Sequence, residues 1–440
     1  MRIALTRRHK ILFAQSYRGT KWLITGLLTL STILNFIDRQ TLSILAPFLR
    51  DKFHIDVQGY SHIVAAYLIA YSVMYTFAGR FVDWVGERIG MAACIAWWSI
   101  CTMLTGLATG AWSLGMFRFL LGLGEPGNFP AALRATTEWF PREERGLPIA
   151  LFSSGSAVGY VIAPPLIAIL TLRFGWRVAF LVPGLLGLLW LVAWLAVYRN
   201  PVDHPSLTNE ARIKLLRDLD QPQADAPLPS WRSLLKNRNV LALVLSRFVS
   251  DPVSYFYAFW IPEYLMRERG FSLSAIGMYA WIPFVAGAIG GMVGGRASDL
   301  LIKRGVPAAK SRRRILYISA AVAPLGVFTS QVRSASAAIF LMSIMAFVVY
   351  CWFINTAAMI PDIVSNRAVG SVLGVVGTAG SASGVLFTFL VGFLVSHYSS
   401  YTAVFAILGS MHLIAAAILW FLSTDQQQET SHIEQHHQEA

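Results

Sequence analysis

Charged residues are scarce in this sequence. Only 13% of its 440 residues are Asp, Glu, Lys or Arg, whereas 55% are hydrophobic, and the mean hydropathy is +0.55. A soluble globular domain carries about a quarter charged residues. The shortage of charge therefore excludes an ordinary soluble domain and favours a membrane protein.

Cysteine is scarcer still, with Cys94, Cys101 and Cys351 as the full set, each inside an apolar stretch. Their spacing is not that of metal ligands, and an odd number in apolar helices does not form a disulfide framework. Small apolar packing residues are the simplest interpretation. We therefore expect no metal to be bound by these cysteines, and we expect no cofactor.

A cleavable signal pattern is also lacking at the N-terminus. Arg7-Arg8-His9-Lys10 precedes a stretch of mixed polarity, and the first long apolar run leads into Asp38 rather than a small-residue cleavage site. We expect this run to be kept as a membrane span.

Apolar residues instead form repeated runs of about 20 residues, the length of a helix that crosses the hydrocarbon core of a bilayer. Alternating segments of about 10 residues, typical of transmembrane barrels, do not occur in the sequence. We therefore predict an all-α polytopic membrane protein with twelve transmembrane helices. From hydropathy and loop residues, their expected ranges are about 22–48, 61–79, 89–108, 112–138, 146–170, 176–198, 240–262, 274–296, 314–330, 336–359, 368–396 and 401–423.

One long polar, proline-rich segment divides these spans into two groups of six. Most other gaps between spans are short, so this segment reads as a linker between two halves. The predicted organisation is a cytoplasmic N-terminus, an N-terminal six-helix bundle, a cytoplasmic central loop, a C-terminal six-helix bundle and a disordered cytoplasmic tail. Their ranges are 1–21, 22–198, 199–239, 240–423 and 424–440.

The net charge of +13 comes from an uneven distribution of Lys and Arg. With the N-terminus inside, about 26 of the 36 fall on the cytoplasmic side and about 7 outside, and three lie within spans. That asymmetry favours cytoplasmic placement of both termini. Topology and contact with the lipid bilayer explain the basic balance better than nucleic-acid binding, which we do not expect.

The chain also repeats a short motif. Gly79-Arg80-Phe81-Val82-Asp83 follows the second predicted span and leads to Arg88, and Gly295-Arg296-Ala297-Ser298-Asp299 follows the eighth. Two parallel halves with a binding site between them are typical of transporters. We expect these segments to be loops that act as cytoplasmic latches.

Charged side chains inside predicted spans are the strongest functional signal. Asp38 and Arg39 lie in the first span, and Arg118 and Glu125 lie seven residues apart in the fourth. Charges at this depth cost a few kcal/mol each and usually mark a functional site. If Asp38 and Glu125 take up protons, an arginine is freed to receive a carboxylate, and by linkage proton and anion help each other bind.

A static buried network that only fixes helix packing is the alternative interpretation of these four residues. Arg247 and Asp251, four residues apart in the seventh span, share a helix face and can neutralise each other. We interpret that pair as structural.

The twelve spans, the central loop and Gly79-Arg80-x-x-Asp83-x-x-Gly86-x-Arg88 resemble the major facilitator superfamily over about residues 20–423. Further segments resemble its anion:cation symporter family, which includes bacterial hexuronate and aldonate carriers. They are Asn35-Phe36-Ile37-Asp38-Arg39 and Arg118-Phe119-x-x-Gly122-x-Gly124-Glu125-x-x-x-Phe129-Pro130. Two more segments are similar to the hexuronate branch of that family: Gly155-Ser156-Ala157-Val158-Gly159 leading to Ala163-Pro164-Pro165, and Trp260-Ile261-Pro262-Glu263-Tyr264-Leu265. One departure is Gly-Arg rather than Gly-Gly at residues 79–80.

The resemblance implies a role for each charged residue. Arg39 matches the arginine that holds the substrate carboxylate, Asp38 and Glu125 match acids that carry protons, and Arg118 matches the arginine that couples them. It further implies substrate contacts by two polar residues, Tyr71 and Ser381.

Tyr257 and Asn355 are weaker candidates, which would contact substrate hydroxyls from the second half. Polar helix packing is the competing interpretation for both residues, as it is for Tyr71 and Ser381.

Together these features predict a monomeric carrier of a bacterial inner membrane that takes up a sugar acid with protons by alternating access. Galacturonate, glucuronate or an aldonate is the expected substrate. Tartrate, phthalate or another small organic acid, export by antiport, and a transporter-like receptor that moves nothing remain open. An enzyme is disfavoured because no nucleophile–base set or metal motif occurs outside the charged cluster.

Overall fold

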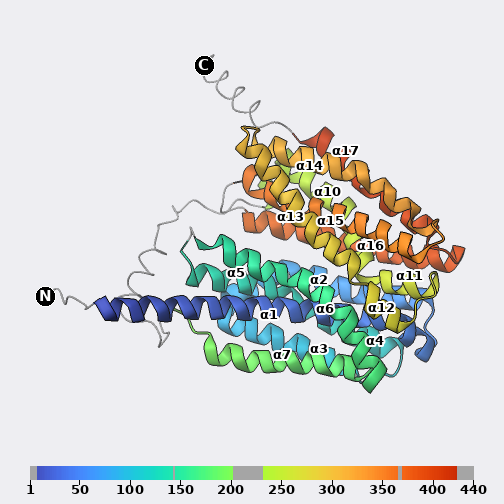
Figure 1. Cartoon of the computed structure of the whole chain (residues 1–440), viewed down its shortest axis with the longest axis horizontal. Coiled ribbons are helices and arrows are strands. Elements are labelled where there is room, and N and C mark those ends of the chain that lie inside the picture. The colour runs from blue at the N-terminus through green and yellow to red at the C-terminus, as the bar shows by residue number, and fades with distance from the viewer. Residues whose placement is uncertain (1–6, 142–143, 202–230, 365–368, 424–440) are drawn as a thin grey trace, which may run out of the picture. The chain divides into compact units, whose positions relative to one another are not determined.

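The computed structural model describes residues 7–141, 144–201, 231–364 and 369–423. Throughout these ranges the regular structure is helical (Figure 1). The helices form two compact units. The first takes its described residues from Met1–Asp225 and Ala258–Phe284, and the second from Ala226–Tyr257 and Val285–Ala440.

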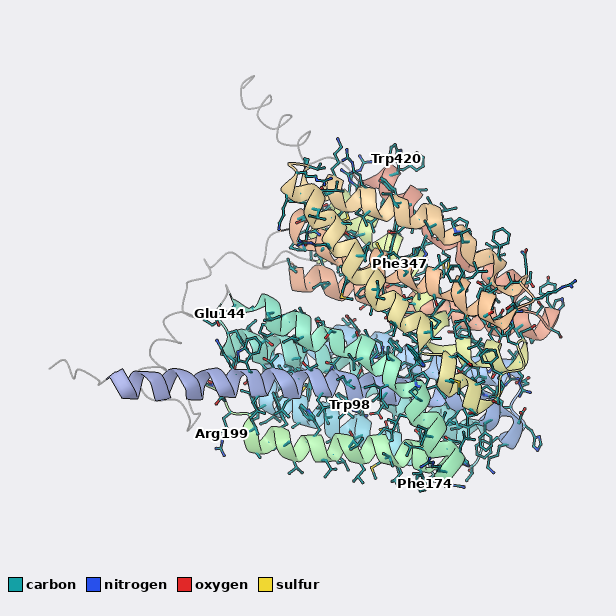
Figure 2. The ribbon with its side chains drawn as sticks, in the orientation of Figure 1. Trp98, Glu144, Phe174, Arg199, Phe347 and Trp420 are labelled. Carbon is teal, nitrogen blue, oxygen red and sulfur yellow. The ribbon has the colours of Figure 1, made fainter. Side chains whose placement is uncertain are left out.

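Helices of the first unit pack in pairs, with α1 against α6, α2 against α4 and α3 against α7. All of these except α4 are long and apolar enough to cross a bilayer, and the buried faces of the paired helices meet within the unit. Trp98 illustrates the burial, since its ring is fully buried among these helices (Figure 2). The main helices are α1 (Arg7–Phe53), α2 (Val57–Val85), α3 (Glu87–Thr105), α4 (Ala111–Gly124), α5 (Asn128–Trp139), α6 (Gly146–Phe174) and α7 (Val178–Val197).

The α1–α6 crossing depends on two glycines of α6. A Cβ atom at Gly155 would lie 2.7 Å from the carbonyl oxygen of Thr29, and one at Gly159 would lie 2.8 Å from that of Ile33. Small residues four apart allow two helix backbones to approach closely in a membrane. This contact holds α1, with its Asp38 and Arg39, firmly within the unit.

The fourth predicted span is interrupted. Between α4 and α5 lies the short 3₁₀ helix η1 (Glu125–Gly127), with Pro126 inside it. Proline cannot supply a backbone N–H to a continuing α-helix, so the backbone changes at this point. Glu125 therefore lies at the break rather than on a regular helix with Arg118.

Residues 258–284 were expected in the C-terminal bundle but group with the first unit. They contain α11 (Ile261–Arg267), which packs on α1, and α12 (Leu273–Tyr279), which packs on α6. The Tyr60 hydroxyl donates a 2.6 Å hydrogen bond to the carbonyl oxygen of Phe259. Arg50 forms an ion pair with the buried carboxylate of Glu263. These polar contacts explain why residues 258–284 group with the first unit. A hydropathy profile contains no information on such contacts.

The second unit is built around a core of buried aliphatic and aromatic side chains that includes Trp352. Gly290 and Gly294 bring α13 against α15, because a Cβ atom at Gly290 would lie 2.3 Å from the carbonyl oxygen of Phe347. Trp420, by contrast, is 67% exposed on the outside of this unit (Figure 2). Its helices are α9 (Trp231–Lys236), α10 (Arg238–Phe259), α13 (Ile282–Lys303), α14 (Ala308–Val322), η3 (Ala323–Ser330), α15 (Ala335–Ile363), α16 (Val369–Tyr398) and α17 (Thr402–Leu422).

Among the described residues, nine helices are long and apolar enough to cross a membrane. The other three expected spans are 112–138, 240–262 and 314–330. The first breaks at η1, the second contains the charged pair Arg247 and Asp251, and the third divides into α14 and η3. The prediction of an all-helical, multi-pass fold is confirmed.

The two repeated motifs are not loops, contrary to the expectation from the sequence. Gly79 and Asp83 lie within the last turns of α2, and Gly295 and Asp299 lie within α13. Beyond the first motif the chain turns at Gly86, whose φ of +80° lies in the left-handed region that favours glycine. The motif residues are therefore positioned by helix ends. Residues 202–230 and 424–440, which hold most of the predicted central loop and the tail, lie outside the described residues.

Candidate functional site

The first unit contains a buried pair formed by Arg39 of α1 and Glu125 of η1. Arg39 donates from Nε at 3.2 Å and from Nη2 at 3.0 Å, and both bonds reach the same carboxylate oxygen, Oε2. The side chains of Arg39 and Glu125 are 8% and 0% exposed. A buried charge of either sign is costly unless it is paired. This pair leaves the guanidinium compensated by a group that can itself be neutralised by one proton.

Aromatic rings surround the Arg39 guanidinium. Its central carbon lies 4.6 Å from the ring centroid of Phe36, 4.7 Å from that of Tyr71 and 5.8 Å from that of Tyr67. Cations are attracted to the faces of aromatic rings. The rings orient the planar side chain while two tyrosine hydroxyls bring polar groups to the same place.

Tyr160 of α6 closes another side of this cluster. Its ring meets Phe36 edge-on at 5.0 Å and stacks on Phe284 at 4.6 Å. Its hydroxyl is placed to interact with Arg39. The site around Arg39 therefore combines one cation, one acid and three tyrosines, a set suited to a hydroxylated organic anion.

Asp38 and Arg118 form the adjoining part of the site. Nη1 of Arg118 donates to the backbone carbonyl oxygen of Asp38 at 3.2 Å, and its guanidinium lies 5.5 Å from the Phe180 ring centroid. The Asp38 carboxylate is fully buried and faces Thr102, with Glu125 and Arg118 as its charged neighbours. The four charged residues predicted from the sequence are thus brought together. Arg39 forms its ion pair with Glu125, not with its sequence neighbour Asp38.

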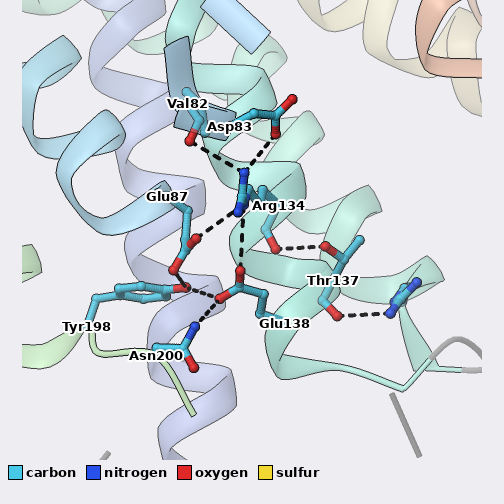
Figure 3. Close-up of polar contacts among 9 residues, drawn as sticks. Val82, Asp83, Glu87, Arg134, Thr137, Glu138, Tyr198 and Asn200 are labelled. Atoms are coloured by element: carbon cyan, nitrogen blue, oxygen red, sulfur yellow. Dashed lines mark hydrogen bonds and ion pairs between the residues drawn. The ribbon is translucent and has the colours of Figure 1, made fainter. Parts of the chain in front are cut away.

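A second charged cluster lies where α2 ends and α3 begins (Figure 3). Arg134 of α5 contacts Asp83 at 2.7 Å, Glu87 at 3.3 Å and Glu138 at 3.6 Å. Tyr198 donates to Glu87 at 3.1 Å, and Glu138 accepts from Asn200 at 2.9 Å. One guanidinium thus binds three carboxylates from three helices, so the cluster ties these helix ends together.

Of the other predicted latch residues, Arg88 lies at the start of α3, and Gly295 and Asp299 lie in the second unit. Arg88 donates to the carbonyl oxygen of Leu195 at 2.8 Å, which fastens α3 to α7. A Cβ atom at Gly295 would lie 3.5 Å from the Ile354 side chain, and the Asp299 side chain is exposed. A latching role for these residues remains a prediction.

The second unit has its own buried ion pair. Arg247 donates to both carboxylate oxygens of Asp251, at 2.5 Å and 2.8 Å, and its guanidinium lies 4.4 Å from the ring centroid of Phe353. The two residues lie four apart on α10, as the sequence predicted. Direct neutralisation is consistent with a structural role.

Three predicted substrate contacts, Tyr257, Asn355 and Ser381, lie in the second unit and are buried. Asn355 donates to the carbonyl oxygen of Cys351, and Ser381 donates to that of Gly377, so these bonds run within their own helices. Their role in binding remains a prediction. Within the described ranges no group of three His, Cys, Asp or Glu side chains is arranged as metal ligands.

Sequence reasoning missed several residues of this site. Tyr67 lies one helical turn from Tyr71, and that spacing is the signal that could have found it. Phe36 belongs to the Asn35–Arg39 motif, which assigns it no role of its own, and no local pattern marks Tyr160, because its position depends on the α1–α6 crossing. Arg134 lies near the end of a predicted span, where a basic residue is ordinary.

Known proteins provide an independent comparison. The chain is 31% identical over 411 residues to a hexuronate transporter of Escherichia coli (strain K12), covering 92% of this chain and 94% of that protein. It is 32% identical to a galacturonate transporter of Dickeya chrysanthemi, over 71% and 93% of the two chains. A probable galactarate/D-glucarate transporter of Escherichia coli (strain K12) is 28% identical over 92% and 95%.

Among solved structures, a bacterial homolog of the human lysosomal transporter Spinster, in an inward-facing and unoccupied conformation, superposes with a TM-score of 0.69. It is 20% identical and covers 92% of this chain and 95% of its own, which supports the fold alone. The sequence signature of the Major Facilitator Superfamily matches residues 28–388. The predictions of a multi-pass transporter rather than an enzyme, and of its superfamily, are confirmed: the chain belongs to the Major Facilitator Superfamily.

Proposed function

We propose that this transporter takes up a sugar acid together with protons, with a hexuronate such as galacturonate or glucuronate, or an aldonate, as substrate. The observation that carries the proposal is the buried pair of Arg39 and Glu125. An arginine can give two parallel hydrogen bonds to a carboxylate, which a lysine cannot. The relatives named as hexuronate and galacturonate transporters support the choice of substrate class.

The charge balance at this pair supports proton coupling. While Glu125 is ionised, its Oε2 occupies the Nε and Nη2 donors of Arg39. A proton on Glu125 removes that charge, and the Arg39 donors can then turn to a substrate carboxylate. Asp38, buried beside Glu125 and Arg118, offers a second place for a proton. Proton and anion binding reinforce each other because each compensates the charge that the other leaves.

The tyrosines supply the specificity for a hydroxylated ligand. Hydroxyl groups of Tyr67, Tyr71 and Tyr160 lie around the same guanidinium. A site built to hydrogen-bond several substrate hydroxyls discriminates against ligands that lack them, because its buried polar groups would be left unpaired. Sugar acids satisfy both the cation and these hydroxyls.

Uptake of labelled galacturonate into proteoliposomes tests the proposal. With an inward proton gradient we expect accumulation above equilibrium, which glucuronate competes and Arg39→Ala abolishes. Glu125→Gln is expected to spare binding more than proton-driven accumulation. No uptake by the wild type, beside an active control carrier, would remove galacturonate as the substrate.

A smaller organic acid is the second candidate, because one relative is a probable sulfoacetate transporter of Cupriavidus necator at 27% identity. A competition panel with tartrate, phthalate and sulfoacetate separates this candidate from sugar acids. Flux itself separates a carrier from a receptor that only binds.

We also propose that the chain is a monomer in a bacterial inner membrane with both termini cytoplasmic. The excess of Lys and Arg on one side of the predicted topology supports this orientation. Labelling of single cysteines placed at either terminus, in intact and opened cells, tests it. Reaction in intact cells with an impermeant reagent would contradict the orientation.

A further inference from the structure

The Glu125 carboxylate is bonded unequally at its two oxygens. Oε2 accepts two bonds from Arg39 and a 2.5 Å bond from the Tyr67 hydroxyl. Oε1 is buried and has no hydrogen-bond partner among the described residues. Both hydrogen-bond partners of Glu125, Arg39 and Tyr67, therefore bind the same oxygen. They differ in whether they can accept a hydrogen bond from Glu125 once it is protonated.

Arg39 and Tyr67 differ in hydrogen-bonding capacity. A guanidinium only donates, so it cannot receive the O–H of a protonated carboxyl group. A tyrosine hydroxyl both donates and accepts. Tyr67 can therefore donate to the Glu125 carboxylate and, by rotating its O–H bond, accept from the Glu125 carboxylic acid without moving its ring.

Packing holds Tyr67 in the position that this exchange requires. Its ring lies 5.7 Å from that of Tyr71 and 5.6 Å from that of Phe259. Its backbone carbonyl oxygen lies against Gly122 of α4, where a Cβ atom would approach to 2.5 Å. The close α2–α4 crossing thus sets the distance between Tyr67 and Glu125, which follows Gly122 by three residues.

We propose that Tyr67 is a positioning residue for proton coupling: it remains the hydrogen-bond partner of Glu125 in both protonation states, while Arg39 leaves Glu125 for the substrate carboxylate. This inference rests on the proposed proton-coupled transport. Without Tyr67, a protonated Glu125 would be buried with an unsatisfied donor, which is an expensive arrangement. The chain would still bind its substrate through Arg39 but would couple it poorly to protons.

Other titratable and charged groups also lie near Glu125, and they define the background against which its pH dependence is read. They are Asp38 and Arg39 on α1, Tyr67 on α2, Arg118 on α4 and Tyr160 on α6, while Tyr71 lies one step further away, beside Tyr67 and Arg39. Substitution of Tyr67 alone leaves all the charged members in place.

Tyr67→Phe in proteoliposomes tests the inference through two readouts on one preparation. Exchange of labelled for unlabelled galacturonate across the membrane needs no net proton movement, whereas accumulation under an inward proton gradient does. At saturating galacturonate, where bound substrate favours the protonated form of Glu125, we expect exchange to stay within about twofold of wild type, and accumulation to fall by roughly tenfold or more with an altered pH profile. Tyr67→Gln, which restores a donor and an acceptor, is expected to recover part of the accumulation.

Tyr60→Phe is the matched control, because Tyr60 lies on the same helix and its hydroxyl bonds to Phe259 instead. It is expected to change exchange and accumulation by the same factor. Equal loss of both activities in Tyr67→Phe, or no loss of either, would overturn the inference. If the wild type itself exchanged galacturonate but showed no proton-driven accumulation, the proposed coupling would fail, and this inference with it.

Discussion

Replacing Arg39 by lysine separates charge from geometry at the centre of the site. The arginine donates two N–H bonds to Oε2 of Glu125, at 3.2 and 3.0 Å. Its guanidinium carbon lies 4.6 Å from the ring centroid of Phe36 and 4.7 Å from that of Tyr71. Lysine keeps the positive charge but loses one charge-assisted bond, worth about 1.5–3 kcal/mol, and much of the ring contact, worth about 0.5–1 kcal/mol. The expected loss in substrate binding is about 2–4 kcal/mol, or roughly 30- to 900-fold in affinity.

Calorimetric titration of galacturonate into purified protein measures this loss. Arg177→Lys is the control, because the Arg177 guanidinium lies 4.7 Å from the Trp176 ring centroid but belongs to an exposed residue outside the site. The control is expected to bind like the wild type. If Arg39→Lys also bound within twofold of the wild type, a two-pronged contact with the substrate carboxylate would be refuted.

Three further predictions concern stability, measured as thermal unfolding in detergent. Arg247→Met alone is expected to destabilise the folded protein by about 3–5 kcal/mol, because it leaves Asp251 buried and unpaired. The double variant Arg247→Met with Asp251→Leu is expected to be nearly as stable as the wild type. An equal loss of stability in the single and double variants would argue against direct pairing. Gly159→Val should prevent the α1–α6 approach and lower expression of folded protein, and wild-type behaviour would contradict the crossing. Arg134→Ala should cost about 2 kcal/mol or more by stranding its carboxylate partners, while Asp83→Asn, at a 72% exposed side chain, should cost less than about 1 kcal/mol.

The sequence was sufficient for the helical fold and for the four charged residues of the first unit. Hydropathy registers any helix that must bury its backbone in lipid, and charges stand out against that background because they are costly there. Asp38, Arg39, Arg118 and Glu125 were therefore visible without a structure, and so was the four-residue spacing of the Arg247 pair.

The sequence was insufficient wherever a feature depends on which helices cross. Pro126 indicates a break in the fourth span. That the break places Glu125 opposite Arg39 depends on the packing of η1 against α2 and α4, which the sequence does not reveal. Tyr160 joins the site only because Gly155 and Gly159 bring α6 onto α1. The grouping of residues 258–284 with the first unit rests on contacts such as Tyr60 with Phe259, and hydropathy carries no record of those.

The helical character of the predicted latch segments was missed for a different reason. Glycine and polar residues at 79–83 and 295–299 resemble the end of a helix, yet helices α2 and α13 continue through them to Val85 and Lys303. The helix α2 stops where Gly86 adopts a positive φ. A single glycine in that conformation decided the boundary, and the neighbouring Gly79 and Gly90 look equivalent to it in the sequence.

The most direct test of the account is the affinity for galacturonate as a function of pH, in the wild type and in Glu125→Gln. If protonation of Glu125 releases Arg39 for the substrate, wild-type affinity should strengthen as the pH is lowered, since proton and anion binding are linked. Glu125→Gln, which cannot hold the charge, should bind substrate with most of that pH dependence lost. A wild-type affinity that does not change with pH, or an equal dependence in the variant, would contradict the central role of the Arg39–Glu125 pair.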